Sequence, residues 1–350
     1  QGPAVLMPRK NPVGSKLSAR SLGGLGAGMV VAGLALLVLG WSAPLLLFVK
    51  AVLFLAGVIV LAQGLSRVVW AVRGGRPDIL LWLCCGWLVL LAVVALLAPV
   101  LPLGEHVDVV KALDAPIYEP PKLLSAYPLG TNNYGLDMLS RSIYGARTSL
   151  VIALSAVAIG TVVGGSIGVV AGFLRSGVDS VIGVVTNALL AVPPLVLLIA
   201  LATVLEPKLR NVALALALLT IPSMIRLARA NTIAFAQREF VLAARAMGAT
   251  KLRIMWRELV PNVVLPIFSM MVVMISVLIV AEASLSFLGF GVQAPEPTWG
   301  NMISEAEGST MQEHPHIVLV PGVFLFLTVF SFNLLGEKAQ KRWDPRSAKL

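Results

Sequence analysis

The sequence is short of charged side chains. Only 13% of its 350 residues are charged and 58% are hydrophobic, whereas soluble domains carry about 25% charged residues. The mean hydropathy is +0.90. A chain of this composition cannot cover a soluble surface with polar groups. This excludes a soluble enzyme, a disordered protein and a secreted disulfide scaffold.

Cysteine and histidine are also scarce. The only cysteines, Cys84 and Cys85, are adjacent within an apolar run, which favours simple packing over a disulfide or a metal site. Two of the three histidines stand in the stretch 313–316, Glu-His-Pro-His. This spacing is a weak metal signal, and we expect a solvated loop there.

A phosphate-binding loop is missing as well. The pattern Gly-x-x-x-x-Gly-Lys-Ser/Thr does not occur, so the chain cannot bind ATP in that mode. No set of residues suggests a nucleophile with its base. We therefore expect no catalytic residues, no cofactor site and no metal site in this chain.

Long apolar runs are what the sequence has in abundance. A helix needs about 20 mostly apolar residues to cross a bilayer. Eight runs are candidates, of which the sixth is short: 22–40, 44–66, 79–103, 149–174, 181–205, 212–225, 263–289 and 317–335. They predict an all-α, multi-pass membrane protein.

The few charges are unevenly placed. Lysine and arginine number 27 against 17 acids, a net charge of +10. With eight spans both ends share one side, and that side holds 20 of the 27 basic residues, in 1–21, 67–78, 226–257 and 338–350 and at Arg175. The positive-inside rule places it in the cytoplasm. The basic excess is thus an orientation signal, and we expect no nucleic-acid partner.

The first residues carry little information about the fold. Residues 1–3, Gln-Gly-Pro, look like the remnant of a protease-cleavage site left by expression. The first apolar run is longer than a signal-peptide core of about 7–15 residues, so we expect a retained helix.

Three features inside the spans suggest specific packing or function. Gly160, Gly164, Gly168 and Gly172 recur every four residues, which places them on one helix face and lets a neighbouring helix approach closely. Pro193-Pro194 must break or kink the fifth span, either to line a cavity or as a purely structural bend.

Glu282 is the one acid inside an expected span. An intramembrane carboxylate is a functional candidate by default. Because Glu282 lies near the outer end of its span, the structural alternative is a bond to nearby backbone or to a partner such as Arg141 or Arg147.

The longest cytoplasmic loop carries the clearest motif. Residues 239–247 are strong helix formers, Gly248 interrupts them, and a second helical piece follows to Pro261. We expect a rigid knob whose surface is kept shallow by Ala243 and Ala244, so that another protein can pack against it.

This stretch resembles the EAA loop of ABC-transporter permease subunits. The family pattern has Glu-Ala-Ala, a glycine four residues beyond the second alanine, and a proline thirteen residues after that. Ala243, Ala244, Gly248 and Pro261 match it, and Leu242 replaces the usual glutamate. In that family the loop forms the coupling helix that docks onto the ATPase subunit.

The resemblance extends over residues 79–346 and points to the C-subunit type of dipeptide and oligopeptide permeases. Matching blocks occupy 129–150, 282–300, 321–336 and 344–346. Asn132 and Leu136 depart from the pattern, which has aspartate and arginine there. The two N-terminal spans depart too, since the usual family member has six.

The resemblance implies a type I ABC importer permease core of six transmembrane helices, with two extra N-terminal transmembrane helices. The implied divisions are an N-terminal extension (4–78), the first core helix with an extracytoplasmic segment (79–148), the permease core (149–337) with its coupling loop (226–262), and a cytoplasmic tail (338–350). The residues implied to meet the ATPase are Ala243, Ala244, Arg245, Met247, Gly248, Ala249, Thr250 and Lys251.

The implied partners are a homologous permease subunit, two ATPase subunits that bind ATP and Mg²⁺, an extracytoplasmic substrate-binding protein and membrane lipid. The implied location is a bacterial or archaeal cytoplasmic membrane, with both termini cytoplasmic. Di- or oligopeptide cargo is favoured. Nickel, a glycan, an opine or a haem-like cargo carried by the same machine stays open, as does a regulatory subunit without a pore.

Overall fold

The computed structural model describes residues 19–42, 56–57, 60, 63–64, 78–122, 125–174, 177–306 and 308–343. These ranges contain helices and turns but no strand, apart from an isolated antiparallel bridge between Thr131 and Asp137. The chain divides into two compact units, residues 1–83 and 84–350. Each unit is described separately below.

The first unit contains α1 (Ala19–Ser42). This helix is 24 residues long and includes the whole first expected run, 22–40. The second expected run, 44–66, lies almost entirely outside the described residues. Gly64 is described, and it packs tightly on α1, because a methyl group added there would lie 2.7 Å from the backbone nitrogen of Val30. The two extra spans therefore stay a prediction.

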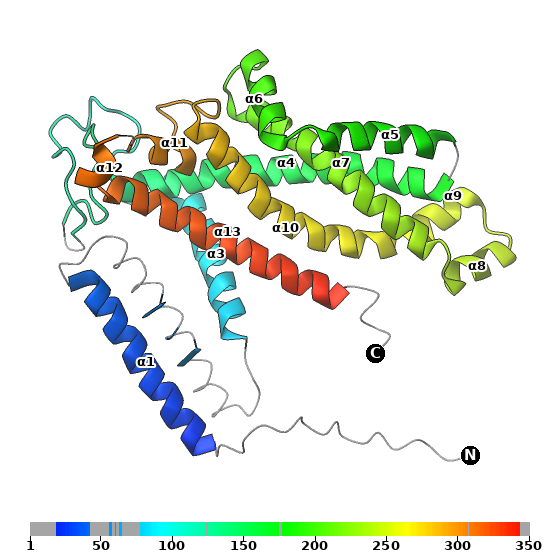
Figure 1. The fold of residues 1–350 in the computed structure, drawn as a ribbon, viewed down its shortest axis with the longest axis horizontal. Helices are drawn as coiled ribbons and strands as arrows, with labels where there is room; N and C mark the ends of the chain where they lie inside the picture. The colour runs from blue at the N-terminus through cyan, green and yellow to red at the C-terminus, as the bar shows by residue number, and fades with distance from the viewer. Residues whose placement is uncertain are drawn as a thin grey trace. The chain divides into compact units, whose positions relative to one another are not determined.

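The second unit is a bundle of long helices with short ones at its ends (Figure 1). Its long helices are α4 (Met138–Leu174), α5 (Gly177–Ala191), α6 (Pro194–Val204), α7 (Leu209–Phe235), α10 (Val260–Phe287) and α13 (His316–Trp343). A further long helix, α3 (Ile79–Leu97), begins in the first unit and continues into the second. The short elements are α8 (Glu239–Ala246), α9 (Lys251–Ile254), η1 (Met255–Leu259), α11 (Trp299–Ser304) and α12 (Thr310–Glu313).

The helices match the six core spans expected after residue 78. Five described helices are long and apolar enough to cross a membrane, and the bent pair α5–α6 makes a sixth if it is one span. The expected boundaries were too short at three of them, among them α13, which continues to Trp343 rather than ending at 335. α4 begins at Met138 rather than 149, and α7 continues to Phe235 rather than ending at 225. Apolar runs mark only the lipid-facing length of a helix, whereas polar residues packed against protein extend it.

The glycine stripe of α4 packs against α7, as predicted. A methyl group added at Gly164 would lie 2.5 Å from the carbonyl oxygen of Ile221, and one at Gly168 would lie 2.5 Å from that of Ile225. Only glycine allows the two backbones to approach this closely. The stripe therefore fixes α4 and α7 as one rigid pair.

The main core lies where α4, α7 and α10 meet α11. Ile152, Leu216, Ile279 and Trp299 are all completely buried there. The Trp299 indole nitrogen donates a hydrogen bond to the Ser142 carbonyl oxygen at 3.0 Å, which satisfies its polar atom inside the core. This core holds the short helix α11 firmly against the start of α4.

Candidate functional site

The predicted knob exists and has a small core of its own. In α8, Val241 and Ala244 are buried, and they pack with Ile254 and Leu259 beyond the turn. The spacing of three residues between Val241 and Ala244 puts both on one helix face. We refer to residues 239–259, which comprise α8, the turn, α9 and η1, as the knob.

Gly248 makes the turn between α8 and α9. Its φ is +80°, a left-handed conformation that strongly favours glycine. The Gly248 amide donates to the Arg245 carbonyl, and the Ala249 amide donates to the Ala244 carbonyl, both at 3.0 Å. This pair of bonds is a Schellman motif, which satisfies the last carbonyls of a helix. The motif thus has glycine at this position because the turn requires a left-handed backbone conformation there.

The second part of the knob begins with a cap and does not stop at Pro261. The Thr250 side chain accepts a hydrogen bond from the Arg253 amide and caps α9. The π-helical turn η1 follows and leads directly into α10, so 251–287 is one continuous helical segment. The expected end of the second piece at Pro261 was wrong, because the helix continues through this proline directly after the π-helical turn.

Apolar side chains cover the outer face of the knob. Met247 is 80% exposed, and Leu252 and Trp256 are each 64% exposed. Leu242 is also exposed, and so is Ala243. Exposed apolar side chains gathered on one loop are typical of a protein-docking surface. Arg245 and Lys251 add positive charge beside them.

One residue expected on that surface lies inside the knob. Ala244 is only 6% exposed and packs in the core of the knob. The prediction that Ala244 keeps the outer surface shallow was therefore wrong, whereas Ala243 does lie outside. The helical period explains the difference, since neighbouring residues are about 100° apart around the axis.

Pro193 and Pro194 separate α5 from α6. The two helices meet at 88°, and the bend is visible in Figure 1. Pro193 precedes the first turn of α6, where no side chain caps the helix. All residues from 187 to 196 are exposed in the isolated chain. The predicted break is thus confirmed, and it is sharper than a kink.

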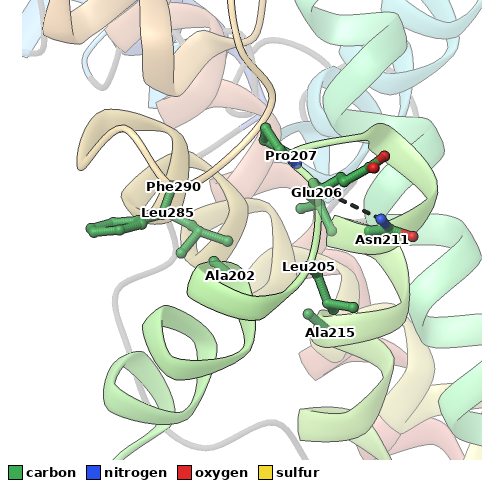
Figure 2. Close-up of a pocket in the computed structure, with 9 residues that line it drawn as sticks. Ala202, Leu205, Glu206, Pro207, Asn211, Ala215, Leu285 and Phe290 are labelled. Atoms are coloured by element: carbon green, nitrogen blue, oxygen red, sulfur yellow. Dashed lines mark hydrogen bonds between the residues drawn. The ribbon is translucent and has the colours of Figure 1, made fainter.

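Figure 2 shows the other end of α6, near the first turn of α7 and the end of α10. Leu205, Glu206, Asn211 and Leu285 line a pocket there, and the Asn211 amide donates to the Glu206 carbonyl oxygen at 3.1 Å. Its free volume is about 10 Å³, room for about one water molecule. This pocket is too small to hold a cargo molecule.

Glu282 is completely buried and bound by hydroxyl groups. Ser149 of α4 and Ser286 of α10 each donate to one of its carboxylate oxygens at 2.7 Å. Glu282 therefore joins α4 to the end of α10.

The arginines considered as partners of Glu282 lie elsewhere. Arg141 binds Glu305 through two hydrogen bonds of 2.5 and 2.7 Å, and Asn132 donates to the same carboxylate at 3.0 Å. Arg147 is exposed. The structural alternative named an arginine as one possible partner of Glu282, and the Ser149 and Ser286 hydroxyls take that place instead.

The histidines are held by aromatic and backbone contacts. The His314 ring stacks on Tyr118 with centroids 4.1 Å apart, and the His316 Nε2 atom lies 3.0 Å from the Thr131 carbonyl oxygen. His106 stacks on Tyr144, and burial lowers the pKa of the His106 imidazole. Among the described residues, no cluster of three or more His, Cys, Asp or Glu side chains could hold a metal.

Asp137 shapes the start of α4. Its carboxylate accepts hydrogen bonds from the amides of Leu139 and Ser140, which satisfies donors that the first helical turn leaves free. Burial raises the pKa of the Asp137 carboxyl, and these backbone bonds partly oppose that shift.

Sequence reasoning missed two ion pairs between helices. Asp179 of α5 binds Arg229 of α7 through two hydrogen bonds, and Arg141 binds Glu305. A signal for the Asp179–Arg229 pair was present in the sequence, since Arg226 and Arg229 stand one helical turn apart. These two arginines were assigned to the cytoplasmic loop because the apolar run ends at 225.

Together, these features define a multi-pass α-helical membrane protein whose long spans carry a knob with exposed apolar side chains. Residues 164–349 match the family model described as "Binding-protein-dependent transport system inner membrane component". This match covers more than half of the chain, which therefore belongs to that family of transport permeases. Its members are membrane subunits of transporters and not enzymes.

Several curated relatives are similar to the chain. The glutathione transport system permease protein GsiD of Pectobacterium atrosepticum is 37% identical over 63% of this chain and 73% of its own length. The dipeptide transport system permease protein DppC of Haemophilus influenzae is 38% identical over 63% and 75%, and that of Alkalihalophilus pseudofirmus is 35% identical over 62% and 71%.

Among solved structures, the chain is similar to an inward-facing form of the MetNI methionine ABC transporter. The sequences are 19% identical, the TM-score is 0.46, and the match covers 59% of this chain and 97% of that one.

Proposed function

We propose that this chain forms half of the translocation pathway of an ATP-driven importer for di- or oligopeptides. It pairs with a homologous permease subunit, rests on two ATPase subunits that bind ATP and Mg²⁺, and receives cargo from an extracytoplasmic binding protein. The relatives are dipeptide and glutathione permeases, which supports peptide cargo. The location is a bacterial or archaeal cytoplasmic membrane, with both termini cytoplasmic.

The observation that carries ATPase coupling is the knob. It presents exposed apolar side chains, above all Met247 and Leu252, on a helix–turn–helix with its own core. The knob continues without a break into α10. A push on the knob by the closing ATPases therefore reaches a membrane span directly. Such a switch works only if nucleotide and cargo bind the inward and outward states with different affinity.

The break between α5 and α6 supports a place beside the pathway. Non-helical backbone at membrane depth is tolerated only where it is buried in protein or lines a water-filled space. Pro193 and Pro194 are exposed in the isolated chain. The break must then face the partner permease or the aqueous pathway rather than lipid.

The complete transporter, reconstituted with its binding protein, tests this function. We expect peptide-stimulated ATP hydrolysis and peptide uptake. Met247→Asp should lower both strongly, because it places a charge in an apolar contact. Met311→Asp is the matched control, since Met311 is 52% exposed on α12, away from the knob.

Three results would contradict the proposal. If peptides do not stimulate hydrolysis but nickel, a glycan, an opine or a haem-like compound does, the cargo is wrong. If the chain co-purifies with active ATPases but removing it leaves uptake intact, the subunit is regulatory and forms no pore. If Met247→Asp and Met311→Asp behave alike, the knob is not the coupling surface.

A further inference from the structure

A polar groove runs between α5 and α7. Its volume is about 340 Å³, and it is separate from the knob and from the Glu282 cluster. The residues that line it are Asp179, Ser180, Ile182, Gly183, Val184, Thr186, Asn187, Ile225, Arg226 and Arg229. Polar side chains at this density are unusual between two apolar membrane helices.

The groove carries a net positive charge. Arg229 and Asp179 neutralise each other through two hydrogen bonds of 2.5 and 2.7 Å. Arg226 donates to the Asn187 side-chain oxygen at 3.2 Å and otherwise has no partner among the described residues. A guanidinium group has five N–H donors, so most of those of Arg226 are available to a ligand.

Thr186 adds an unused hydroxyl to this groove. The residue is 5% exposed, and its hydroxyl oxygen has no hydrogen-bond partner in the described part of the chain. Other helical threonines, such as Thr220 and Thr328, donate to the carbonyl four residues earlier. Thr161 and Thr232 also lack partners, but they do not line the groove. A buried hydroxyl without a partner is costly.

Position decides which ligand suits these donors. Asp179 lies in the first turn of α5, at the end of the bundle near the knob. Arg226 lies nine residues from the end of α7 at Phe235, about 14 Å along the helix, and its long side chain can extend toward the membrane surface. Val181, Val184 and Val185 leave an exposed apolar face on α5 beside the groove.

We propose that this groove binds the phosphate of an anionic phospholipid in the cytoplasmic leaflet. Arg226 and Thr186 donate to the phosphate oxygens, and the valines of α5 contact the acyl chains. Basic pockets between helices on this side of a membrane are suited to such headgroups. The inference rests on the orientation given under the proposed function, but it does not depend on the cargo.

Lipid retention by the complete transporter tests the site. The complex is reconstituted into nanodiscs of phosphatidylcholine and phosphatidylglycerol, extracted in detergent, washed, and its bound phosphatidylglycerol is counted by mass spectrometry. We expect about tenfold less bound phosphatidylglycerol for Arg226→Gln and about threefold less for Thr186→Val, since the first variant loses a positive charge with its donors and the second loses one hydroxyl donor.

Two matched controls should behave as wild type. Arg210→Gln removes an exposed arginine at the other end of α7, and Thr161→Val removes a partnerless hydroxyl outside the groove. Thr186→Val is nearly isosteric, so it remains informative if Arg226→Gln fails to assemble.

The result that overturns the proposal is equal lipid retention in the groove variants and their controls. It is also overturned if peptide displaces the lipid, which would make the groove a cargo site, or if Arg226→Gln releases the partner permease without changing lipid retention. If the wild-type complex retains phosphatidylglycerol but peptides do not stimulate its ATP hydrolysis, the proposed function is contradicted and the lipid site is not.

Discussion

Gly248 shows why a single backbone angle matters in the knob. Its φ of +80° closes the turn between α8 and α9, although the space around it is open. Substitution is therefore limited by conformation and not by volume. Each of the two hydrogen bonds of the turn depends on that angle.

For Gly248→Ala we predict a knob destabilised by about 1–2 kcal/mol, the cost of a left-handed alanine. Peptide-stimulated ATP hydrolysis of the complex should fall accordingly. Gly322→Ala is the matched control, because Gly322 has equally open space but no positive φ. Equal hydrolysis in both variants would show that the turn is not needed for coupling.

Glu282 illustrates a buried acid whose partners come from two helices, α4 and α10. For Glu282→Gln we predict a loss of about 1–3 kcal/mol of stability, because the amide nitrogen cannot accept a hydroxyl proton and one buried donor loses its partner. Thermal unfolding of the purified complex measures this, with the exposed Glu296→Gln as control. Unchanged stability with lost transport would instead assign Glu282 a direct role in transport.

At the scale of elements, the α4–α7 pair is the most sharply specified contact. Gly165 stands next to the stripe but not on it, and a methyl group there would lie 3.7 Å from the nearest side-chain atom, an ordinary distance. The face of α4 that carries the glycine stripe thus has no room for a methyl group, whereas the neighbouring face at Gly165 has room for one.

We predict that Gly168→Ala destabilises the protein by roughly 1–3 kcal/mol through overpacking against Ile225. Gly165→Ala should be neutral or slightly stabilising, because alanine is the better helix former. Thermal unfolding of the two variants in the same detergent compares them. If Gly165→Ala is the more damaging change, the packing of α4 on α7 described above is incorrect.

Element boundaries were predictable only in part. Apolar runs correctly indicated five core spans in their order, and a sixth if the bent pair α5–α6 is one span, because lipid exposure requires continuous apolar length. They missed the first turns of α4 and the last turns of α7, where Arg141 and Arg229 lie in the helices. Both arginines are tolerated because a carboxylate from another segment pairs with each.

At the scale of the whole molecule, charge placement predicts orientation. The segment holding the knob and both chain ends carry most of the lysine and arginine residues. We predict that a fluorescent protein fused to either end lies in the cytoplasm, and that alkaline phosphatase inserted at the exposed Leu113 is active outside. Alkaline phosphatase can also be fused to each chain end in turn. If it is active at one end and inactive at the other, the predicted even number of spans is wrong.

The sequence by itself determined the membrane class, the core spans, the close packing at the α4 glycines, the break at Pro193-Pro194 and the turn at Gly248. These features depend on apolar length, on a four-residue period and on residues with special backbone geometry, all of which are local. Only the tertiary structure decided that Ala244 points inward and that Arg141 pairs with Glu305. It also decided that Glu282 binds Ser149, 133 positions away. Partner choice is set by packing between distant segments, because a buried polar group takes whichever donor or acceptor the fold brings within reach.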